Sequence, residues 1–463
     1  FHPLAILLVP IIKGGEMVML FPILKAADRW FKRYGFLVQS IIWVAYSYLS
    51  QSWFAGYPYG TISSAVYEYL PFIQIADFSG IWGVTFLMIL PQALLGRYVA
   101  DQWTPMRQSI MHFLASYRIA VMVYGLLMVA TFVYGFLTLS IWNKEEPDKI
   151  WRVATVQHNA DSWKGGFETY RRNFNNLRTM SLQALQGDPD MIIWSETAFV
   201  PSVAWHTTYK THEATATLVD EFVEFGKSLP VPLLTGNPEG VRKDDQAPPL
   251  NPDGTWNRMD YNTVIMFEGG EIRKTYRKQH LVPFTEHFPY EKELPWLYNL
   301  LLANDYNWWE KGYDPVVFET DEGVRFSTPI CFEDVFGYLS AGFVRNGADV
   351  IVNMTNDSWS GAVSAEVQHL ALAVFRSIEN RRSTVRGTNS GITAVILPTG
   401  AVIDPMEPFT RGWHIYDVPV YESDEFTLYT RYVDILAVIA VYVSCALLLI
   451  GATLRILRRR KER

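Results

Sequence analysis

The segment VRFSTPICFED, residues 324–334, shows the feature from which the fold of this protein can be predicted. It begins as a short apolar strand and leads directly into a cysteine followed by two carboxylates. Two other apolar runs have the same form, since MIIWSE (191–196) ends in a glutamate and DVIVNMTND (349–357) ends in an asparagine and an aspartate. Ligands of open α/β sheets bind beyond the strand ends. The pattern therefore predicts a sheet with reactive side chains gathered at one edge.

Strand-like and helix-like segments alternate around these runs between residues 145 and 431. Strand-like runs cover residues 152–157, 191–194, 232–235, 263–267, 325–330, 350–354 and 392–397. Amphipathic helix-like runs cover residues 169–185, 212–228 and 365–380. Such alternation predicts an α/β domain in which helices cover the faces of a sheet.

One polar segment of this region, KTYRKQHLVPFTEHFP (274–289), is predicted to be a loop because its two prolines would break a helix. The side chains that it presents are Lys278, His280, Glu286 and His287. For the two histidines we favour a structural hydrogen-bonding role over a catalytic one.

Apolar segments flank the α/β region on both sides. Residues 120–141 and 435–454 each supply the roughly 20 apolar residues that a spanning helix needs. Residues 71–95, 36–48 and 4–24 are softer candidates, the last interrupted by the charged stretch KGGE. We predict a transmembrane bundle over residues 1–144, a catalytic domain over 145–431, and a membrane helix with a basic tail over 432–463.

The distribution of basic residues predicts an orientation for these helices. Three clusters carry the Lys and Arg of the short loops and tail: Lys25, Arg29, Lys32 and Arg33; Arg97, Arg107 and Arg118; and Arg455, Arg458, Arg459, Arg460, Lys461 and Arg463. If all three are cytoplasmic, the helices alternate consistently and residues 145–431 face the periplasm. Because the first residue is Phe, we expect the chain to begin inside a longer protein.

Composition narrows the function classes. The net charge is −7, and no long basic run occurs before the C-terminus, which argues against a nucleic-acid partner. Of the two cysteines, Cys445 lies in an apolar run, so Cys331 is expected to be a free thiol. No paired Cys/His spacing is present, and we expect neither a metal nor a cofactor.

Residue types alone suggest a chemistry for Cys331. A thiol has a pKa of about 8.5 and becomes a good nucleophile when a carboxylate takes its proton or a cation stabilises the thiolate. Glu196 is a candidate base, and Lys278 is a candidate for stabilising the thiolate and then an oxyanion. These residues are far apart in sequence, so their spacing does not establish a triad.

Four motifs together resemble the nitrilase superfamily: IIWSE (192–196), YRKQHLVPFTE (276–286), ICFED (330–334) and TNDSW (355–359). Three further features are HLVPF followed by a glutamate, NSGITAVILPTG (389–400) and the flanking membrane helices. Together they resemble the apolipoprotein N-acyltransferase family, which is the membrane-embedded branch of the nitrilase superfamily. The resemblance implies a four-layer αββα sandwich inserted between transmembrane helices. Family members have eight such helices; five are counted here, which fits a truncated start.

The resemblance also implies residue roles. Glu196 matches the general base, Lys278 the oxyanion-stabilising lysine and Cys331 the nucleophile that becomes acylated. Glu286 and Glu333 match acidic residues that support the site. The chain departs from the family pattern at Thr285, where glycine is usual, and at Phe332, where tyrosine is frequent.

The implied reaction is a two-step exchange in an inner-membrane enzyme. Cys331 would take an acyl chain from a phospholipid, and the thioester would pass it to the α-amino group of a lipidated N-terminal cysteine on a lipoprotein. The phospholipid, the apolipoprotein and the bilayer are the implied partners. Two alternatives stay open: a membrane-tethered nitrilase-like amidase that hydrolyses a small amide, and a non-enzymatic receptor or scaffold.

Two further groups of residues admit more than one interpretation. Residues 294–309 form either a core helix or, as we favour, an arm that dips into the bilayer and lines an acyl groove. The residues predicted to contact lipid are Trp296, Leu297, Leu300, Leu301 and Trp359. Arg381, Arg382 and Arg386 either bind lipid phosphate or mark a solvated helix end.

Overall fold

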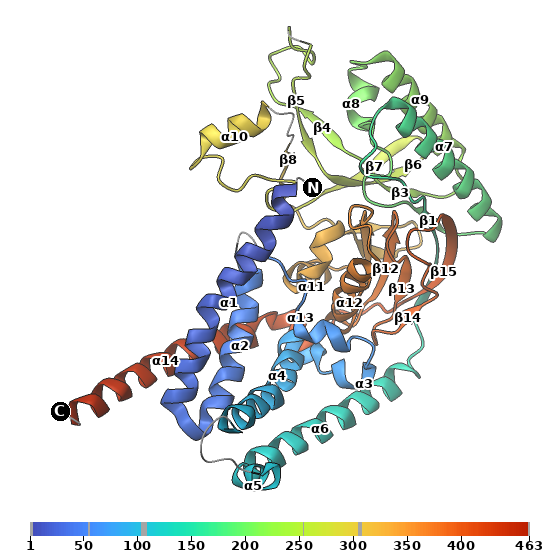
Figure 1. Ribbon diagram of the computed structural model, residues 1–463. Helices are drawn as coiled ribbons and strands as arrows, with labels where there is room; N and C mark the ends of the chain where they lie inside the picture. The colour runs from blue at the N-terminus through green and yellow to red at the C-terminus, as the bar shows by residue number, and fades with distance from the viewer. Residues whose placement is uncertain (1–2, 54–55, 103–108, 253, 304–307, 462–463) are drawn as a thin grey trace. The chain divides into compact units, whose positions relative to one another are not determined.

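The structure is a computed structural model and describes residues 3–53, 56–102, 109–252, 254–303 and 308–461 (Figure 1). The chain divides into two compact units. One comprises Phe1–Glu145 with Thr427–Arg463 and is helical, and the other comprises Glu146–Phe426 and contains the sheets. The predicted division into domains at 144/145 and 431/432 stays a prediction. That the first unit lies in a membrane and the second in the periplasm stays a prediction.

Among its described residues, the helical unit contains five long α-helices and three short ones. They are α1 (Pro3–Phe31), α2 (Gly35–Ser52), α3 (Leu70–Ile73), α4 (Ala76–Gln102), α5 (Ile110–Ser116), α6 (Arg118–Trp142), α13 (Leu428–Tyr432) and α14 (Ile435–Lys461). Among the described residues, α4, α6 and Ile435–Arg458 of α14 are long and apolar enough to cross a membrane. The other two predicted spans, residues 4–24 and 36–48, lie in the helices α1 and α2, which are not among these three.

The predicted basic clusters meet at one end of this helical unit. Arg97 of α4 donates to Asp28 of α1 at 2.9 Å. Arg33 donates to the carbonyl of Ser116, near the start of α6, at 2.7 Å. The basic residues at the ends of α1 and α14 line one pocket. The predicted orientation of the helices requires that all three basic clusters lie at the same end of the unit, as they do here. Arg107 and Arg463 lie outside the described residues.

The α/β unit contains two six-stranded sheets and one of three strands. The first sheet has the order β15 (Gly412–Val420), β1 (Lys149–Gln157), β2 (Met191–Ile193), β3 (Leu233–Gly236), β6 (Thr263–Glu268) and β7 (Glu271–Arg277). The second has the order β14 (Val402–Ile403), β13 (Ala394–Ile396), β12 (Ser383–Thr388), β11 (Val350–Thr355), β10 (Arg325–Ser327) and β9 (Phe318–Glu319). The small sheet is β4 (Glu239–Arg242), β5 (Arg258–Tyr261) and β8 (Trp309–Glu310).

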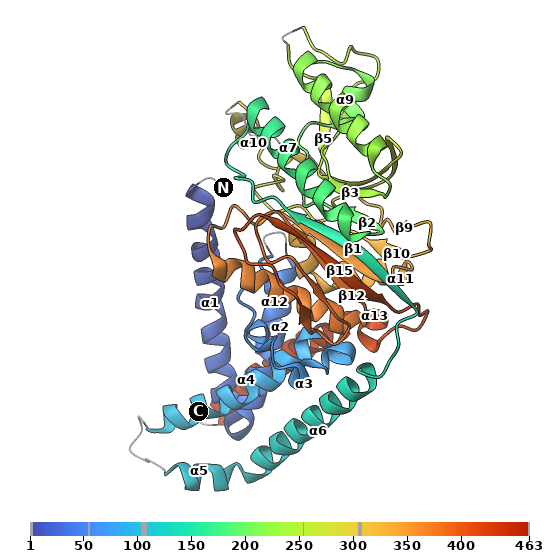
Figure 2. The ribbon, with the colours of Figure 1, turned by 90° about the vertical axis from the view of Figure 1, so that its right-hand side faces the viewer.

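Helices cover the outer faces of the two large sheets (Figure 2). The helices of this unit are α7 (Phe167–Ala184), α8 (Val203–Thr208), α9 (Glu213–Ser228), α10 (Pro295–Leu302), α11 (Gly337–Arg345) and α12 (Val363–Asn380). Apolar residues recur every three or four positions in α7, so Phe174, Leu177 and Met180 share one buried face against the first sheet. Helix α12 packs on β12 of the second sheet.

The inner faces of the two large sheets pack against each other. The rings of Trp151 on β1 and Phe326 on β10 lie 5.1 Å apart. Gly387 of β12 faces Ile193 of β2, where a Cβ atom would lie 3.0 Å from the isoleucine side chain. With helices outside both sheets, these layers form the nitrilase-like αββα sandwich. The predicted fold class is therefore confirmed.

Some element predictions were wrong. Residues 274–277 of the predicted loop belong to strand β7, so Lys278 follows directly on a strand. Strands β12 and β15 were not predicted, because STVRGT and GWHIYDVPV lack a clear apolar alternation. Their polar residues become compatible with a sheet interior only through partners from elsewhere in the chain, which Arg386 illustrates below.

Candidate active site

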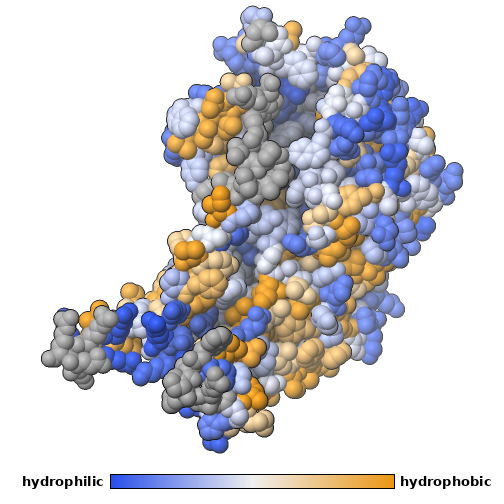
Figure 3. All heavy atoms as spheres, in the orientation of Figure 1, coloured by the Kyte–Doolittle hydropathy of each residue, from blue (hydrophilic) through white to orange (hydrophobic). Residues whose placement is uncertain are grey.

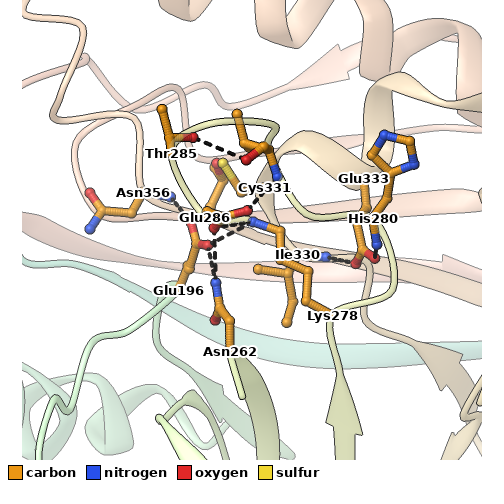
Figure 4. A network of polar contacts seen from close by, with 12 residues as sticks. Glu196, Asn262, Lys278, His280, Thr285, Glu286, Ile330, Cys331, Glu333 and Asn356 are labelled. Carbon is orange, nitrogen blue, oxygen red and sulfur yellow. Dashed lines mark hydrogen bonds and ion pairs between the residues drawn. The ribbon is translucent and has the colours of Figure 1, made fainter. Parts of the chain in front are cut away.

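Glu196 lies just beyond the end of β2 and is 6% exposed. Its approach to β3 requires glycine at position 236, where a Cβ atom would lie 2.7 Å from the Glu196 Cα. One carboxylate oxygen accepts from the Asn262 amide at 2.8 Å, and the other accepts from the backbone N–H of Asn356 at 3.0 Å. The carboxylate is thus held between the ends of strands from both large sheets (Figure 4).

Lys278 directly follows β7 and is 1% exposed. Its Nζ donates to Glu286 Oε1 at 2.8 Å and to Glu196 Oε1 at 3.2 Å. Glu286 is fixed in turn, because its Oε2 accepts from the backbone N–H of Val282 at 2.8 Å. An ammonium group has three donors. Two are engaged by these carboxylates, which leaves one for a reacting group.

Cys331 stands where the chain leaves the second sheet and enters a short 3-10 turn, Cys331–Val335. Its φ is +49°, a left-handed conformation that is costly for a residue with a side chain and is typical of functional sites. The Asn353 amide donates to the Cys331 carbonyl at 3.3 Å. Figure 4 shows the sulfur on the side of the turn that faces Glu196, Glu286 and Lys278.

The electrostatics of these three groups are strongly coupled. Burial, followed by the Glu196 carboxylate, raises the pKa of the Cys331 thiol well above its usual range, although Lys278 opposes this. Burial also raises the pKa of Glu196, again against Lys278. Burial alone would lower the pKa of Lys278, but the two glutamates raise it well above its usual range. The resting site therefore holds a neutral thiol beside a permanent cation and a carboxylate able to accept a proton.

Glu333 joins the cysteine turn to the lysine segment and is fully buried. One oxygen accepts from the backbone N–H groups of Gln279 and His280 at 2.6 and 2.8 Å. The other accepts from the N–H of Ile330 at 2.7 Å, and the Tyr276 hydroxyl donates to both. Burial raises the pKa of Glu333 to about 7, opposed by these donors. Glu333 thus fixes the positions of Lys278 and Cys331 relative to each other.

A second buried network, formed by His369, Arg386 and two aspartates, lies next to the site. His369 contacts Asp334 at 2.7 Å through Nε2 and Asp357 at 3.0 Å through Nδ1, and Arg386 donates to Asp334 at 2.5 Å. Asp334 belongs to the cysteine turn, and Asp357 follows the residue whose N–H binds Glu196. The network therefore connects the backbone segment that carries Cys331 with the segment whose N–H group donates to Glu196.

Both interpretations of Arg381, Arg382 and Arg386 from the sequence are wrong. Arg381, Arg382 and Arg386 are 6%, 3% and 0% exposed, so they form neither a solvated helix end nor an accessible phosphate site. Arg386 neutralises the buried Asp334. Sequence patterns suggested otherwise because they do not show which carboxylates fold against a basic residue.

The His369 network predicts a specific pH dependence. Burial alone would lower the pKa of His369, but Asp334 and Asp357 raise it to about 10. The stabilisation by His369 is therefore complete below its unfolded pKa of about 6.5 and is lost as the pH rises through about 10. We expect the thermal midpoint of the wild type to fall over this range more steeply than that of His369→Gln.

The His369→Gln variant should also be less stable by about 3–5 kcal/mol at neutral pH. The two buried carboxylates then lose one of their two cations, and Arg386 alone remains beside them. Differential scanning fluorimetry at pH 6.5–10 measures both effects. His206→Gln is the matched control, since burial lowers the pKa of His206 to about 4 and no carboxylate among the described residues raises it. An unchanged slope in His369→Gln would show that this histidine is neutral in the folded protein.

Other predicted residues lie outside this cluster. His280 stacks on Phe336 with ring centroids 3.9 Å apart, and its Nδ1 lies 2.8 Å from the Tyr338 hydroxyl. Burial lowers its pKa to about 4, which fits a structural role. Helix α10 has no buried residue, so its interpretation as a core helix is wrong. Trp296 and Trp359 are 66% and 38% exposed.

Several residues of the site had no signal in the sequence. Asn262, Asn353 and His369 are ordinary polar residues at a strand start, inside a strand and in an amphipathic helix. Only the hydrogen bonds described above assign them to the site. Among the described residues, no group of three or more His, Cys, Asp or Glu side chains is arranged to hold a metal ion.

The model of the carbon–nitrogen hydrolase family matches residues 152–425, which form the αββα sandwich and carry Cys331, Glu196 and Lys278. The model of the apolipoprotein N-acyltransferase N-terminal domain matches residues 1–94. The protein is 36% identical over 452 residues to apolipoprotein N-acyltransferase 1 of Treponema denticola, covering 96% of this chain and 82% of that protein.

A second relative gives the same result. Apolipoprotein N-acyltransferase 1 of Treponema pallidum is 35% identical over 469 residues, covering 100% of this chain and 84% of that protein. The chain belongs to the apolipoprotein N-acyltransferase family.

Proposed function

We propose that this protein transfers an acyl chain from a membrane phospholipid, through a thioester on Cys331, to the α-amino group of the lipidated N-terminal cysteine of a lipoprotein. The observation that carries the proposal is the cluster formed by the partly exposed Cys331 with the buried Glu196 and Lys278, in a chain of this family. Glu286 and Glu333 hold the lysine and the cysteine turn in place.

The first half-reaction begins with attack of the Cys331 sulfur on the ester carbonyl of the phospholipid. Because the resting thiol is neutral, its proton passes to Glu196 as the carbon–sulfur bond forms. The free donor of Lys278 stabilises the oxyanion. The ester carbon–oxygen bond then breaks, the leaving oxygen takes the proton from Glu196, and a lysophospholipid departs.

The second half-reaction reverses these roles. The α-amino group of the lipoprotein attacks the thioester carbonyl and gives a proton to Glu196. The carbon–sulfur bond breaks, an amide forms, and the proton returns to the Cys331 sulfur. Water must be excluded from the thioester for the amine to react in its place, and ping-pong kinetics are the expected signature.

We infer that the protein is a multi-pass protein of the cytoplasmic membrane with the Glu146–Phe426 unit in the periplasm. Support comes from the three helices that are long and apolar enough to span a bilayer. The meeting of the basic clusters at one end of the helical unit also supports it, because such residues favour the cytoplasmic side.

Intact-mass analysis of the purified protein after exposure to phospholipid tests the proposal. The wild type should gain the mass of one acyl chain, and hydroxylamine, which cleaves thioesters, should remove it. Adding a diacylglyceryl-cysteine peptide should transfer the chain to the peptide amine. An adduct released only as free fatty acid, with the peptide unmodified, would instead indicate a hydrolase.

We further propose that helix α10 contacts the acyl chains. Trp296, Leu300 and Leu302 are 66%, 53% and 40% exposed, an unusual apolar surface on one short helix. Leu297 and Leu301 of the same helix, and Trp359 after β11, are assigned to the same role.

Trp296→Ser combined with Leu300→Ser should reduce the rate of acylation by phospholipid vesicles about 10-fold or more, because the loss of about 1.5–3 kcal/mol per buried apolar side chain weakens lipid binding. Labelling of Cys331 by a small water-soluble maleimide should stay within about twofold, since these residues lie outside the buried cluster. Leu182→Ser, a change of a 46% exposed leucine in α7, is the control. Equal loss in both assays would contradict a lipid-binding role for α10.

A further inference from the structure

A pocket with a volume of about 510 Å³ lies between the ends of α1 and α14 in the helical unit. The residues that line it are Pro22, Lys25, Ala26, Arg29, Trp30, Gly451, Arg455 and Arg458. Four of these eight are cations, and none is an anion. The pocket shares no residue with the site around Cys331.

The packing of the two helices creates this pocket. Gly451 is buried, and a Cβ atom there would lie 2.4 Å from the Trp30 ring. Below this contact, Leu20 and Ala27 of α1 pack with Leu447 and Leu448 of α14. Glycine at position 451 therefore lets the helices approach closely enough for basic side chains from both to surround one space.

The charges around the pocket are not neutralised. Within the described part of the chain, no carboxylate forms an ion pair with Lys25, Arg29, Arg455 or Arg458. The nearby Asp28 is engaged by Arg97 at 2.9 Å. Figure 3 shows hydrophilic side chains gathered along the C-terminal part of α14. Four cations held together without a counter-charge repel one another, and a bound anion would relieve this.

The surroundings of the pocket indicate the kind of anion. Trp30 is an aromatic residue of the type that lies at the lipid–water boundary. Beside the basic residues, α14 exposes an apolar surface that includes Ile450 and Leu454, which are 50% and 39% exposed. A ligand that combines phosphate with hydrocarbon chains satisfies both surfaces, whereas free phosphate satisfies only the first.

We propose that this pocket binds the headgroup of an anionic phospholipid, and that a lipid with two phosphates binds better than a lipid with one. Basic pockets between membrane helices favour such headgroups. Four cations exceed what one phosphodiester neutralises, and the pocket volume accommodates a larger headgroup. The ligand is a structural lipid at the basic end of the helical unit, separate from the acyl donor.

The test uses the full chain purified in detergent and exposed to cardiolipin, phosphatidylglycerol or phosphatidylcholine, with native mass spectrometry to count retained lipids. We expect retention in the order cardiolipin, phosphatidylglycerol, phosphatidylcholine. Arg455→Gln with Arg458→Gln should reduce cardiolipin retention about tenfold. Lys32→Gln with Arg460→Gln removes the same charge outside the pocket and should change retention less than about twofold. Equal loss in the two double variants would overturn the proposal.

Two further experiments are needed. One distinguishes binding in the pocket from attraction by charge alone, and the other distinguishes binding of a lipid from binding of a free anion. Gly451→Leu keeps every charge but drives a side chain into Trp30, and it should lower cardiolipin retention while leaving maleimide labelling of Cys331 unchanged. Unchanged retention would count against the pocket. Millimolar pyrophosphate should not displace cardiolipin; complete displacement would show a simple anion site. Because Cys331 acylation is measured separately, failure here leaves the proposed function untouched.

Discussion

Replacing Cys331 by serine is expected to abolish acyl-enzyme formation and to reduce acyl transfer by about 10³-fold or more. A hydroxyl is a poorer nucleophile than a thiol and holds its proton more strongly. The environment of the site increases this difference, because burial already raises the pKa of the native Cys331 thiol and would disfavour an alkoxide even more. Intact-mass analysis after phospholipid exposure should show no adduct, and an assay with a diacylglyceryl peptide should show no transfer.

The variant should remain folded, because oxygen for sulfur is a small change at a residue whose backbone is fixed by neighbours such as Asn353. Its thermal midpoint should therefore stay close to that of the wild type. Cys445→Ser is the matched control, since Cys445 is exposed on α14, outside the Glu146–Phe426 unit, and should leave acylation unchanged. Normal acyl transfer by Cys331→Ser would remove the nucleophile assignment.

Replacing Glu333 by glutamine is expected to have the second largest effect. Each oxygen of Glu333 accepts at least one backbone N–H, so an amide NH2 faces a donor in either orientation. A buried donor left unsatisfied costs about 1–3 kcal/mol, and more next to a charged group. The unfolding free energy should fall by at least that amount. Acyl transfer should fall by about 100-fold, because the hydrogen bonds through which Glu333 positions Lys278 relative to Cys331 are lost.

Glu271→Gln, an exposed change in β7, is the control and should alter neither property. The two effects can be separated, since a purely structural role predicts normal turnover at low temperature, where the variant is folded. A positioning role predicts slow Cys331 acylation at all temperatures. Wild-type acylation by folded Glu333→Gln would exclude the positioning role.

Much of the architecture follows from local sequence. The helices α7, α9 and α12 coincide with runs of 3.6-residue periodicity, and β1, β2, β6 and β11 coincide with apolar runs. These predictions succeed because periodicity and apolar length are properties of consecutive residues. The same reason explains the flanking helices, where about 20 apolar residues are sufficient by themselves.

The site could be predicted only in part. The three residues proposed to react could be named from the sequence because each belongs to a motif that resembles the family, at the end of an apolar run or in a proline-containing segment. Their distances and protonation were not, because these depend on Asn262, Glu286 and Glu333, which reach them only in the folded chain. Strand β12 was not predicted for the same reason. Its Arg386 can lie inside a sheet because Asp334 neutralises the charge, and the sequence does not show this pairing.

The fold class and the apolar flanking segments could be predicted from the amino-acid sequence, and Cys331 could be proposed as the nucleophile, since each depends on short stretches of consecutive residues. Three features become visible only in the folded chain: the raised pKa of the Cys331 thiol, the contacts of Lys278 with two carboxylates, and the exposure of α10. The physical reason is that desolvation and Coulomb interactions depend on distance in space. Segments as far apart as Glu196, Lys278 and Cys331 acquire those distances only when two sheets pack face to face.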